Sequence, residues 1–301
     1  MRFVKYAIDT MKLRMQSISR GTTQDNLSLD KLLTFDFLTP PLPTQRKIAA
    51  VLSAYDDLIE NNTRRIAILE ETAQALYREW FVHFRFPGHQ DIALVDSPLG
   101  PIPEGWKVQK LYDISEVTTG YPFKSRRFTE EPVGMPVIRI RDIPNNSTKT
   151  YTDEEADERY KVVNGDILVG MDGDFHMTKW AGGEAYLNQR VARFRPRAGL
   201  PSYYLFLAPR GPIQHFNSTI TGTTVAHLGK KHLVTVDIVA PNSEIVKKIR
   251  DLFQPLLDME SNLHLRNANL RRTRDLLLPR LISGEIDVAD LDIDSGGLND
   301  D

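Results

Sequence analysis

The chain contains no cysteine among its 301 residues. Disulfide bonds, thiolate nucleophiles and cysteine-ligated zinc sites are therefore excluded. No run of residues is long and apolar enough to span a bilayer, and the opening stretch MRFVKYAIDTMKLRMQ lacks the apolar centre of a signal peptide. These absences predict a cytoplasmic protein that does not contact a membrane.

Motifs of common catalytic sites are also absent. The sequence has no P-loop, Gly-rich dinucleotide fingerprint, His-Glu-x-x-His helix or nucleophile elbow, and its seven histidines lack ligand spacing. Asp172 and Asp174 flank Gly173 directly after an apolar run, which leaves a divalent-ion site open, although a tight polar loop is the favoured interpretation. We therefore predict a binding protein without a metal site, rather than an enzyme.

An internal repeat without gaps is present near both ends of the chain. The stretch GTTQDNLSLDKLLTFDFLTPPL, from Gly21, is matched 201 residues later by GTTVAHLGKKHLVTVDIVAPNS, from Gly222. The matches continue beyond it, for example from Leu76 to Leu277. So many matches in one register indicate duplication of a module whose first copy has lost most of its front. Two similar helical hairpins in one core are the alternative.

Each copy of the repeat ends in a long segment with a heptad pattern. Residues 44–84 contain neither glycine nor proline, and apolar residues recur there with alternating spacings of three and four. This spacing predicts a coiled-coil seam, and hence two long helices that pair with each other as a rod of roughly 60 Å. Two ordinary helices on a compact core are the alternative.

The predicted seam residues, available to the other helix or to a partner, are Leu52, Tyr55, Ile59, Ile66, Leu69, Leu76, Trp80, Phe253, Leu256, Leu263, Leu270 and Leu277. Four polar residues fall on the same rows: Asn62, Glu260, Asn267 and Arg274. Polar residues there either shorten the seam or set its register, as a buried asparagine does in other coiled coils.

Between the helices, short β-type runs are separated by turn signals, among them MPVIRI, GDILVGM, GGEAYLNQRVARFRP and HLVTVDIVA. The runs PSYYLFLAP and GPIQHFNSTI have helical character. We therefore expect an α+β fold, with a mixed, strand-rich domain and two long helices. The final residues, 288–301, are acidic and poor in apolar residues, which is typical of a disordered tail.

The formal net charge is only −2, so charge has to be considered locally. In the strand-rich domain, YPFKSRRF combines Lys124, Arg126 and Arg127 with aromatic residues, and VIRIRD places Arg139 and Arg141 on one face of a predicted strand. The planar arginine fork bonds two acceptors at once, as on phosphate or guanine. These clusters favour a surface that reads a DNA groove, and a solvated surface charge is the alternative for each single residue.

Other residue types complete the predicted DNA surface. Asp172 and Asp174 could accept a hydrogen bond from a cytosine amino group. Thr223 and Thr224 are expected to cap a helix whose N-terminal amides meet a phosphate, whereas Gln189 and Arg190 are expected to brace a strand from inside. The predicted DNA-contacting set is Tyr121, Lys124, Arg126, Arg127, Arg139, Arg141, Asp172, Asp174, Lys179, Thr223, Thr224, Lys230 and Lys231.

Several of these stretches resemble one known family. The run PPLPTQRKIAAVLSAYDDLIENNTRRIAILEETAQALYREWFVHF is similar to the central conserved region of type I restriction-modification specificity subunits. PIPEGWKVQKLYDI resembles the start of their target recognition domains, and LRRTRDLLLPRLISGEIDV resembles their closing helix. The resemblance covers nearly the whole chain.

The resemblance implies an architecture of recognition domain, helix, recognition domain and helix, with the two helices pairing as an antiparallel coiled coil. Each recognition domain would read one half of a bipartite site in double-stranded DNA. On this chain the expected parts are a remnant of a first recognition domain (1–43), a first spacer helix (44–87), a target recognition domain (88–243), a second spacer helix (244–287) and the tail (288–301).

The resemblance also implies partners. Methyltransferase subunits would dock on the helices, and restriction subunits would join that assembly. S-adenosylmethionine, ATP and magnesium are expected only in those partner subunits, with no cofactor in this chain. The chain is expected to read one half-site, and a second copy or another specificity fragment would supply the other. A scaffold or remnant that binds partner subunits without reading DNA is the alternative.

A nuclease that uses Asp172 and Asp174 is a third hypothesis, and it can be tested directly. Because the sequence lacks catalytic motifs, we expect the purified chain to leave plasmid DNA intact in the presence of magnesium, as judged by agarose gel. Cleavage that disappears in the Asp172→Ala variant would instead support a nuclease.

Overall fold

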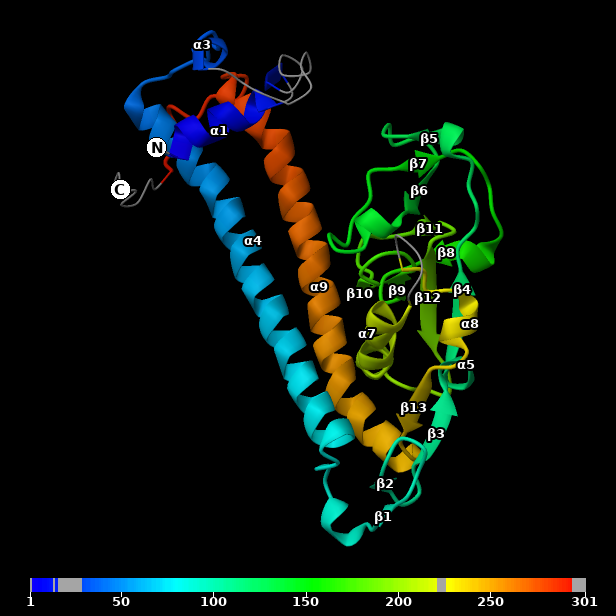
Figure 1. Ribbon diagram of the computed structural model, residues 1–301. Helices are drawn as coiled ribbons and strands as arrows, with labels where there is room; N and C mark the ends of the chain where they lie inside the picture. The colour runs from blue at the N-terminus through cyan, green and yellow to red at the C-terminus, as the bar shows by residue number, and fades with distance from the viewer. Residues whose placement is uncertain (1, 13, 16–28, 221–225, 294–301) are drawn as a thin grey trace. The chain divides into compact units, whose positions relative to one another are not determined.

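The segments with a heptad pattern form two long helices, α4 (Leu42–Tyr77, 36 residues) and α9 (Ser243–Ile282, 40 residues) (Figure 1). The computed structural model describes residues 2–12, 14–15, 29–220 and 226–293. The chain divides into a helix-end unit, residues 1–65 with 263–301, and a sheet unit, residues 66–262. No helix within the described ranges is long and apolar enough to cross a membrane.

Proline and glycine account for the ends of these helices. α4 begins in the PPLP stretch, with Pro43 in its first turn, where a missing N–H group breaks no helical hydrogen bond. After Tyr77 the chain continues through a π-helical turn, Arg78–Val82. α9 ends just before Gly284, whose φ of +77° is a left-handed conformation that glycine adopts without strain.

In the helix-end unit, α4 and α9 run antiparallel. Leu52 of α4 shares a buried cluster with Leu281 of α9. Further along, Asp56 Oδ1 accepts a hydrogen bond from Arg274 Nη1 at 2.6 Å. Rising residue numbers on one helix therefore meet falling numbers on the other, which confirms the antiparallel coiled coil.

An asparagine pair lies inside this seam. Asn62 Nδ2 donates to Asn267 Oδ1 at 2.9 Å, and the two residues are 8% and 2% exposed. Asn267 Nδ2 also lies 3.3 Å from Thr63 Oγ1 and 3.4 Å from the carbonyl oxygen of Ile59. A shift of one helix turn would bury these amides without partners, so the pair sets the register of the two helices.

The short helix α1 (Arg2–Thr10) lies against the same end of the coiled coil. Its Tyr6 is buried in the cluster that contains Leu52, and burial raises the pKa of the Tyr6 hydroxyl. Val288, in the predicted acidic tail, is also buried in this cluster with 3% exposure, so the tail is ordered at its start. Residues 294–301 of the tail lie outside the described residues.

The sequence repeat is also a structural repeat. The one-turn helices α3 (Leu29–Leu32) and α8 (Lys230–Leu233) begin 201 residues apart, and the starts of α4 and α9 have the same separation. Each copy therefore places a short helix, a proline break and a long helix at equivalent positions. The two Gly-Thr-Thr turns fall in 16–28 and 221–225, outside the described residues.

Two larger sheets form the centre of the sheet unit. In the first, the strand order is β10 (Met177–Lys179), β9 (Ile167–Gly170), β12 (Val191–Pro196) and β4 (Ser115–Thr119), all antiparallel. In the second, the order is β5 (Phe128–Thr129), β7 (Tyr151–Thr152), β6 (Met135–Ile138), β11 (Ala185–Leu187) and β8 (Lys161–Val162), and only β6 and β11 pair in parallel. Three of the predicted β-type runs therefore contain strands of these sheets, whereas HLVTVDIVA begins in α8 and is a strand only from Asp237.

Smaller elements complete the unit. Two antiparallel strand pairs join β1 (Leu94–Val95) to β2 (Ile102–Pro103), which are close in sequence, and β3 (Lys107–Lys110) to the distant β13 (Asp237–Ala240). The helices are α5 (Leu111–Ile114), α6 (Ser202–Leu207), α7 (Arg210–Thr219) and α8. α6 and α7 lie in the two segments predicted to be helical.

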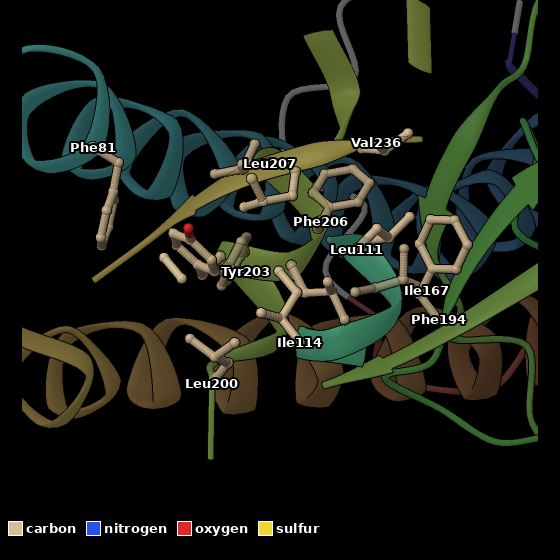
Figure 2. Close-up of a cluster of buried hydrophobic side chains, with 14 of the residues drawn as sticks. Phe81, Leu111, Ile114, Ile167, Phe194, Leu200, Tyr203, Phe206, Leu207 and Val236 are labelled. Carbon is tan, nitrogen blue, oxygen red and sulfur yellow. The ribbon is translucent and has the colours of Figure 1, made fainter. Parts of the chain in front are cut away.

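A large apolar cluster joins these elements (Figure 2). Ile167 and Phe194 reach it from the first sheet, Leu111 comes from α5, and Tyr203 and Phe206 come from α6. All five side chains are at most 7% exposed. The first sheet is thereby held against the helices by apolar packing, which fixes where its strands end.

The asparagine pair gives a stability prediction. The Asn62→Ala change leaves the buried Oδ1 atom of Asn267 without its donor, so we expect the free energy of unfolding to fall by about 1–3 kcal/mol. Replacing both asparagines by leucine is expected to be close to neutral, because no buried amide then lacks a partner. Urea denaturation followed by circular dichroism measures both.

The matched control is Asn61→Ala, since Asn61 is the exposed neighbour in the same helix. It should change the free energy of unfolding by less than about 0.5 kcal/mol. A loss for Asn61→Ala as large as that for Asn62→Ala would mean that the effect comes from helix propensity and not from the buried pair.

Candidate nucleic-acid interface

The registers of four strands of the sheet unit, β4, β6, β9 and β11, show that they end near one another. β4 and β9 are both antiparallel to β12, so both end where β12 begins, with Gly170 of β9 opposite Val191. Tyr121, just after β4, forms a bridge with Asn188, just after β11. β6 is parallel to β11 and ends level with it. The loop edge consists of residues 120–127, 139–142, 171–176, 188–190 and 226–231.

Backbone hydrogen bonds connect three of these loops. Met171 N donates to the carbonyl oxygen of Arg190 at 2.9 Å, and Leu228 N donates to that of Met171 at 2.7 Å. Gly173 N donates to the carbonyl oxygen of Ala226 at 3.1 Å. The loop after β9 is therefore held on both sides, and the side chains that it carries project from a fixed backbone.

Three side chains from these loops form a cluster. His227 Nδ1 lies 2.6 Å from Asp172 Oδ1, and Arg190 Nε lies 3.7 Å from Asp172 Oδ2. Arg190 Nη1 is 3.2 Å from His227 Nδ1. Asp172 is 30% exposed, whereas the side chains of Arg190 and His227 are 52% and 44% exposed. Asp172 is thus engaged by two neighbours, with both partners partly open to solvent.

Sequence reasoning did not select Arg190 or His227 as site residues. The expectation that Arg190 braces a strand from inside is wrong, because its side chain is half exposed and contacts Asp172. The positions of the two residues in the sequence are the only signals that could have identified them. Arg190 lies in the turn between two β-type runs, and His227 closely follows a Gly-Thr-Thr turn.

The basic loop after β4 rests on aromatic rings. The rings of Tyr121 and Phe123 are 4.8 Å apart, and Phe123 is buried. The side chains of Lys124, Arg126 and Arg127 project beyond this base and are exposed. Arg127 Nε forms an ion pair with Asp153 Oδ1 at 2.7 Å. Among the described residues Arg126 has no ion pair, which leaves it available to a phosphate.

Arg139 and Arg141 do not share a strand face. β6 ends at Ile138, and the chain turns into a 3-10 helix at Ile140–Asp142, so the expected alternation fails there. Arg139 bonds Thr150 Oγ1 and lies 5.7 Å over the ring of Phe128, whereas the Arg141 side chain is 68% exposed. Arg141 is therefore the more accessible of the two.

Lys179 is the clearest departure from the predicted DNA set. Its side chain is 4% exposed and its ammonium lies 3.1 Å from Glu70 Oε1 and 3.2 Å from Glu260 Oε1. The same ammonium is 4.6 Å and 4.3 Å from the ring centres of Tyr203 and Phe206. A cation enclosed in this way has no open side for a DNA phosphate, so Lys179 is a structural residue.

Lys230 and Lys231 lie in α8, beside the cluster, and both are exposed. Burial, aided by the positive charge of Lys231, lowers the pKa of His232 in the same helix, so this histidine is neutral at neutral pH. Thr223 and Thr224 lie outside the described residues.

Asp174 is separate from Asp172. Its side chain is 83% exposed, and Oδ2 lies 3.6 Å from His176 Nε2. Across the described ranges, no group of three or more histidine, aspartate or glutamate residues is placed to hold a metal ion.

The predicted seam residues are all at least partly buried. Leu52, Ile59, Ile66, Trp80, Phe253 and Leu263 are buried. Tyr55, Leu69, Leu76, Leu256, Leu270 and Leu277 are half-buried. Other large apolar side chains of the two long helices remain exposed, namely Leu58, Ile68, Leu252, Met259, Leu265 and Leu276.

Known proteins similar to this chain share one description. The family model described as type I restriction modification DNA specificity domain matches residues 1–71 and 103–269. The type I restriction enzyme MjaIX specificity subunit of Methanocaldococcus jannaschii is 28% identical over 297 residues, covering 94% of this chain and 68% of that subunit. The EcoBI specificity subunit of Escherichia coli is 29% identical over 196 residues, covering 64% of this chain and 41% of that subunit.

A solved structure supports the fold. The type I restriction-modification system S subunit from M. genitalium aligns with a TM-score of 0.54 at 16% sequence identity. The alignment covers 93% of this chain and 72% of that one. The chain thus spans only part of the length of each of these relatives.

A substitution of the buried Lys179 distinguishes a structural role from a DNA-contacting role. The Lys179→Ala change removes two ion pairs, to Glu70 and Glu260, from a buried site, so we expect the free energy of unfolding to fall by about 3–5 kcal/mol in urea denaturation. The exposed Lys230→Ala variant, as control, should change it by less than about 0.5 kcal/mol. Unchanged stability with weaker DNA binding for Lys179→Ala would restore the lysine to the DNA surface.

Proposed function

Since the chain belongs to the family of type I restriction modification DNA specificity domains, we propose that it is the DNA sequence-recognition subunit of a type I restriction-modification complex. The observation that carries this proposal is the loop edge. Exposed cations that are far apart in the sequence are gathered there, Arg126 and Arg190 on segments that follow strands and Lys230 at the start of α8.

The strand-rich domain, residues 88–243, reads one half-site in double-stranded DNA. Phosphates are contacted by flexible exposed cations such as Lys124 and Lys231, which fix the position of the domain on the duplex without reading sequence. The less mobile side chains at the centre of the loop edge face the base edges. The mixture of acidic and basic residues suits a groove-reading patch better than a nonspecific polycation.

The two long helices dock methyltransferase subunits. The support for this is the set of large apolar side chains that α4 and α9 leave exposed outside their seam, since such residues are typical of protein interfaces. Restriction subunits join through that complex, and a second copy of the chain or another specificity fragment supplies the second half-site. The complex acts in the cytoplasm.

The chain itself is non-catalytic in this proposal. Methyl transfer and cleavage belong to partner subunits, which bind S-adenosylmethionine, ATP and magnesium.

The proposal is tested by co-expressing the chain with the methyltransferase subunit encoded beside it and mapping methylated bases in genomic DNA. We expect one methylated motif with two specific parts separated by a fixed spacer, because a rigid helix pair holds two readers a constant distance apart. A palindromic motif would indicate two copies of this chain. Co-purification of the subunits without any methylated motif would contradict DNA recognition and leave a scaffold.

A further inference from the structure

We propose that Arg190 and His227 read one G·C base pair in the major groove, and that Asp172 is the positioning residue that holds both. This inference rests on the proposed function and deepens it, because it assigns part of the sequence specificity to three named side chains.

The first argument is the fixed backbone beneath the three residues. The carbonyl oxygen of Arg190 accepts from Met171 N, and the carbonyl oxygen of Met171 accepts from Leu228 N, so the three loops are bonded to one another beside each side chain. Asp172 and His227 also form an isolated β-bridge. Direct reading of a base needs side chains held within about 0.5 Å of the productive geometry, which such a backbone supplies.

The second argument is the placement of protons. A carboxylate oxygen cannot donate, so the 2.6 Å contact requires His227 Nδ1 to carry a proton and donate it to Asp172 Oδ1. In the neutral ring, Nε2 then carries the lone pair and accepts hydrogen bonds.

The third argument is the orientation of Arg190. Its Nε faces Asp172 Oδ2 at 3.7 Å, which directs the fork. Its Nη1 lies 3.2 Å from His227 Nδ1, which donates to Asp172 and so cannot also accept from Arg190, and its Nη2 has no partner among the described residues. The neighbouring arginines of β12 are used differently. Arg193 is fully buried, and Arg195 makes two bonds to Asp166 of 2.6 Å and 2.8 Å. Arg190 is thus the arginine of this segment with donors left for a ligand.

These donors and acceptors match one base pair. In the major groove, guanine presents two acceptors, N7 and O6, and its cytosine presents an amino donor next to them. The arginine fork supplies two donors for guanine, and the lone pair that His227 Nε2 carries when Nδ1 holds the only ring proton supplies an acceptor for the cytosine amino group. A·T pairs present a different order of groups and lack the paired acceptors.

The acidic residue favours base reading over simple phosphate binding. A carboxylate at a DNA-facing edge repels phosphates and weakens nonspecific binding. The presence of Asp172 at this edge is explained if its function is to orient His227 and Arg190. It would not serve a surface that only attracts phosphate.

The test uses the complex of this chain with its partner methyltransferase subunits and a library of random double-stranded DNA, with bound sequences and affinities measured for each variant. We expect Arg190→Lys and His227→Phe to lose discrimination at one G·C position by about 5- to 150-fold, while the other positions of the motif are kept. Asp172→Asn, which preserves shape, should relax the same position by a smaller factor.

Two control variants separate base reading from other roles. Arg126→Ala, in the basic loop, should weaken binding to all sequences equally and leave the motif unchanged. Arg197 is an exposed arginine after the far end of β12, and Arg197→Lys should change neither the affinity for DNA nor the motif. Co-purification with the methyltransferase subunit and an unchanged circular dichroism spectrum check that each variant is folded.

The outcomes are distinguishable. If Arg190→Lys, His227→Phe and Asp172→Asn leave the motif as it is, with or without a uniform loss of affinity, the trio is an ion-pair cluster or a phosphate contact and the inference is overturned. If the wild-type complex itself selects no sequence, the proposed function fails, and the inference fails with it.

Discussion

The ammonium group of Lys179 holds the recognition surface to the helices that carry it. It extends from β10 and lies between Glu70 of α4 and Glu260 of α9, with the rings of Tyr203 and Phe206 closing the space around it. A buried cation is costly unless its partners are well placed, so this arrangement tolerates only one position of the sheet against these parts of the helices. Burial and the nearby Glu260 raise the pKa of Tyr203, which keeps its hydroxyl protonated to donate to that carboxylate.

The direction in which the strands run explains how a mixed-charge chain can build the proposed DNA surface. Strands β4, β6, β9 and β11 end at one edge, so residues from five separate stretches of sequence become neighbours there. Each stretch alone is a modest cluster that many surfaces contain. These clusters become suited to binding because they are gathered on loops whose backbones are hydrogen-bonded to one another. Side chains on fixed loops lose little conformational freedom when a ligand binds.

The two copies of the repeat show how the same pattern depends on its surroundings. The short and long helices recur at equivalent positions in both copies, because capping, proline breaks and heptad spacing are local. The residues equivalent to β13 in the first copy, 36–39, are not a strand within the described structure. β13 is a strand because it pairs with β3, and a strand needs a partner in space as well as a suitable sequence.

The sequence by itself determined the features that depend on neighbours along the chain. Heptad spacing predicted α4 and α9, the β-type runs predicted β6, β9, β11, β12 and β13, and Asn62 and Asn267 stood out as polar residues on an apolar seam. Tertiary structure decided the rest. No local pattern distinguishes Lys179, which is enclosed by carboxylates, from Lys230, which is exposed. Nor does any local pattern bring Asp172, Arg190 and His227 together, because residues up to 55 positions apart meet only through strand order and register.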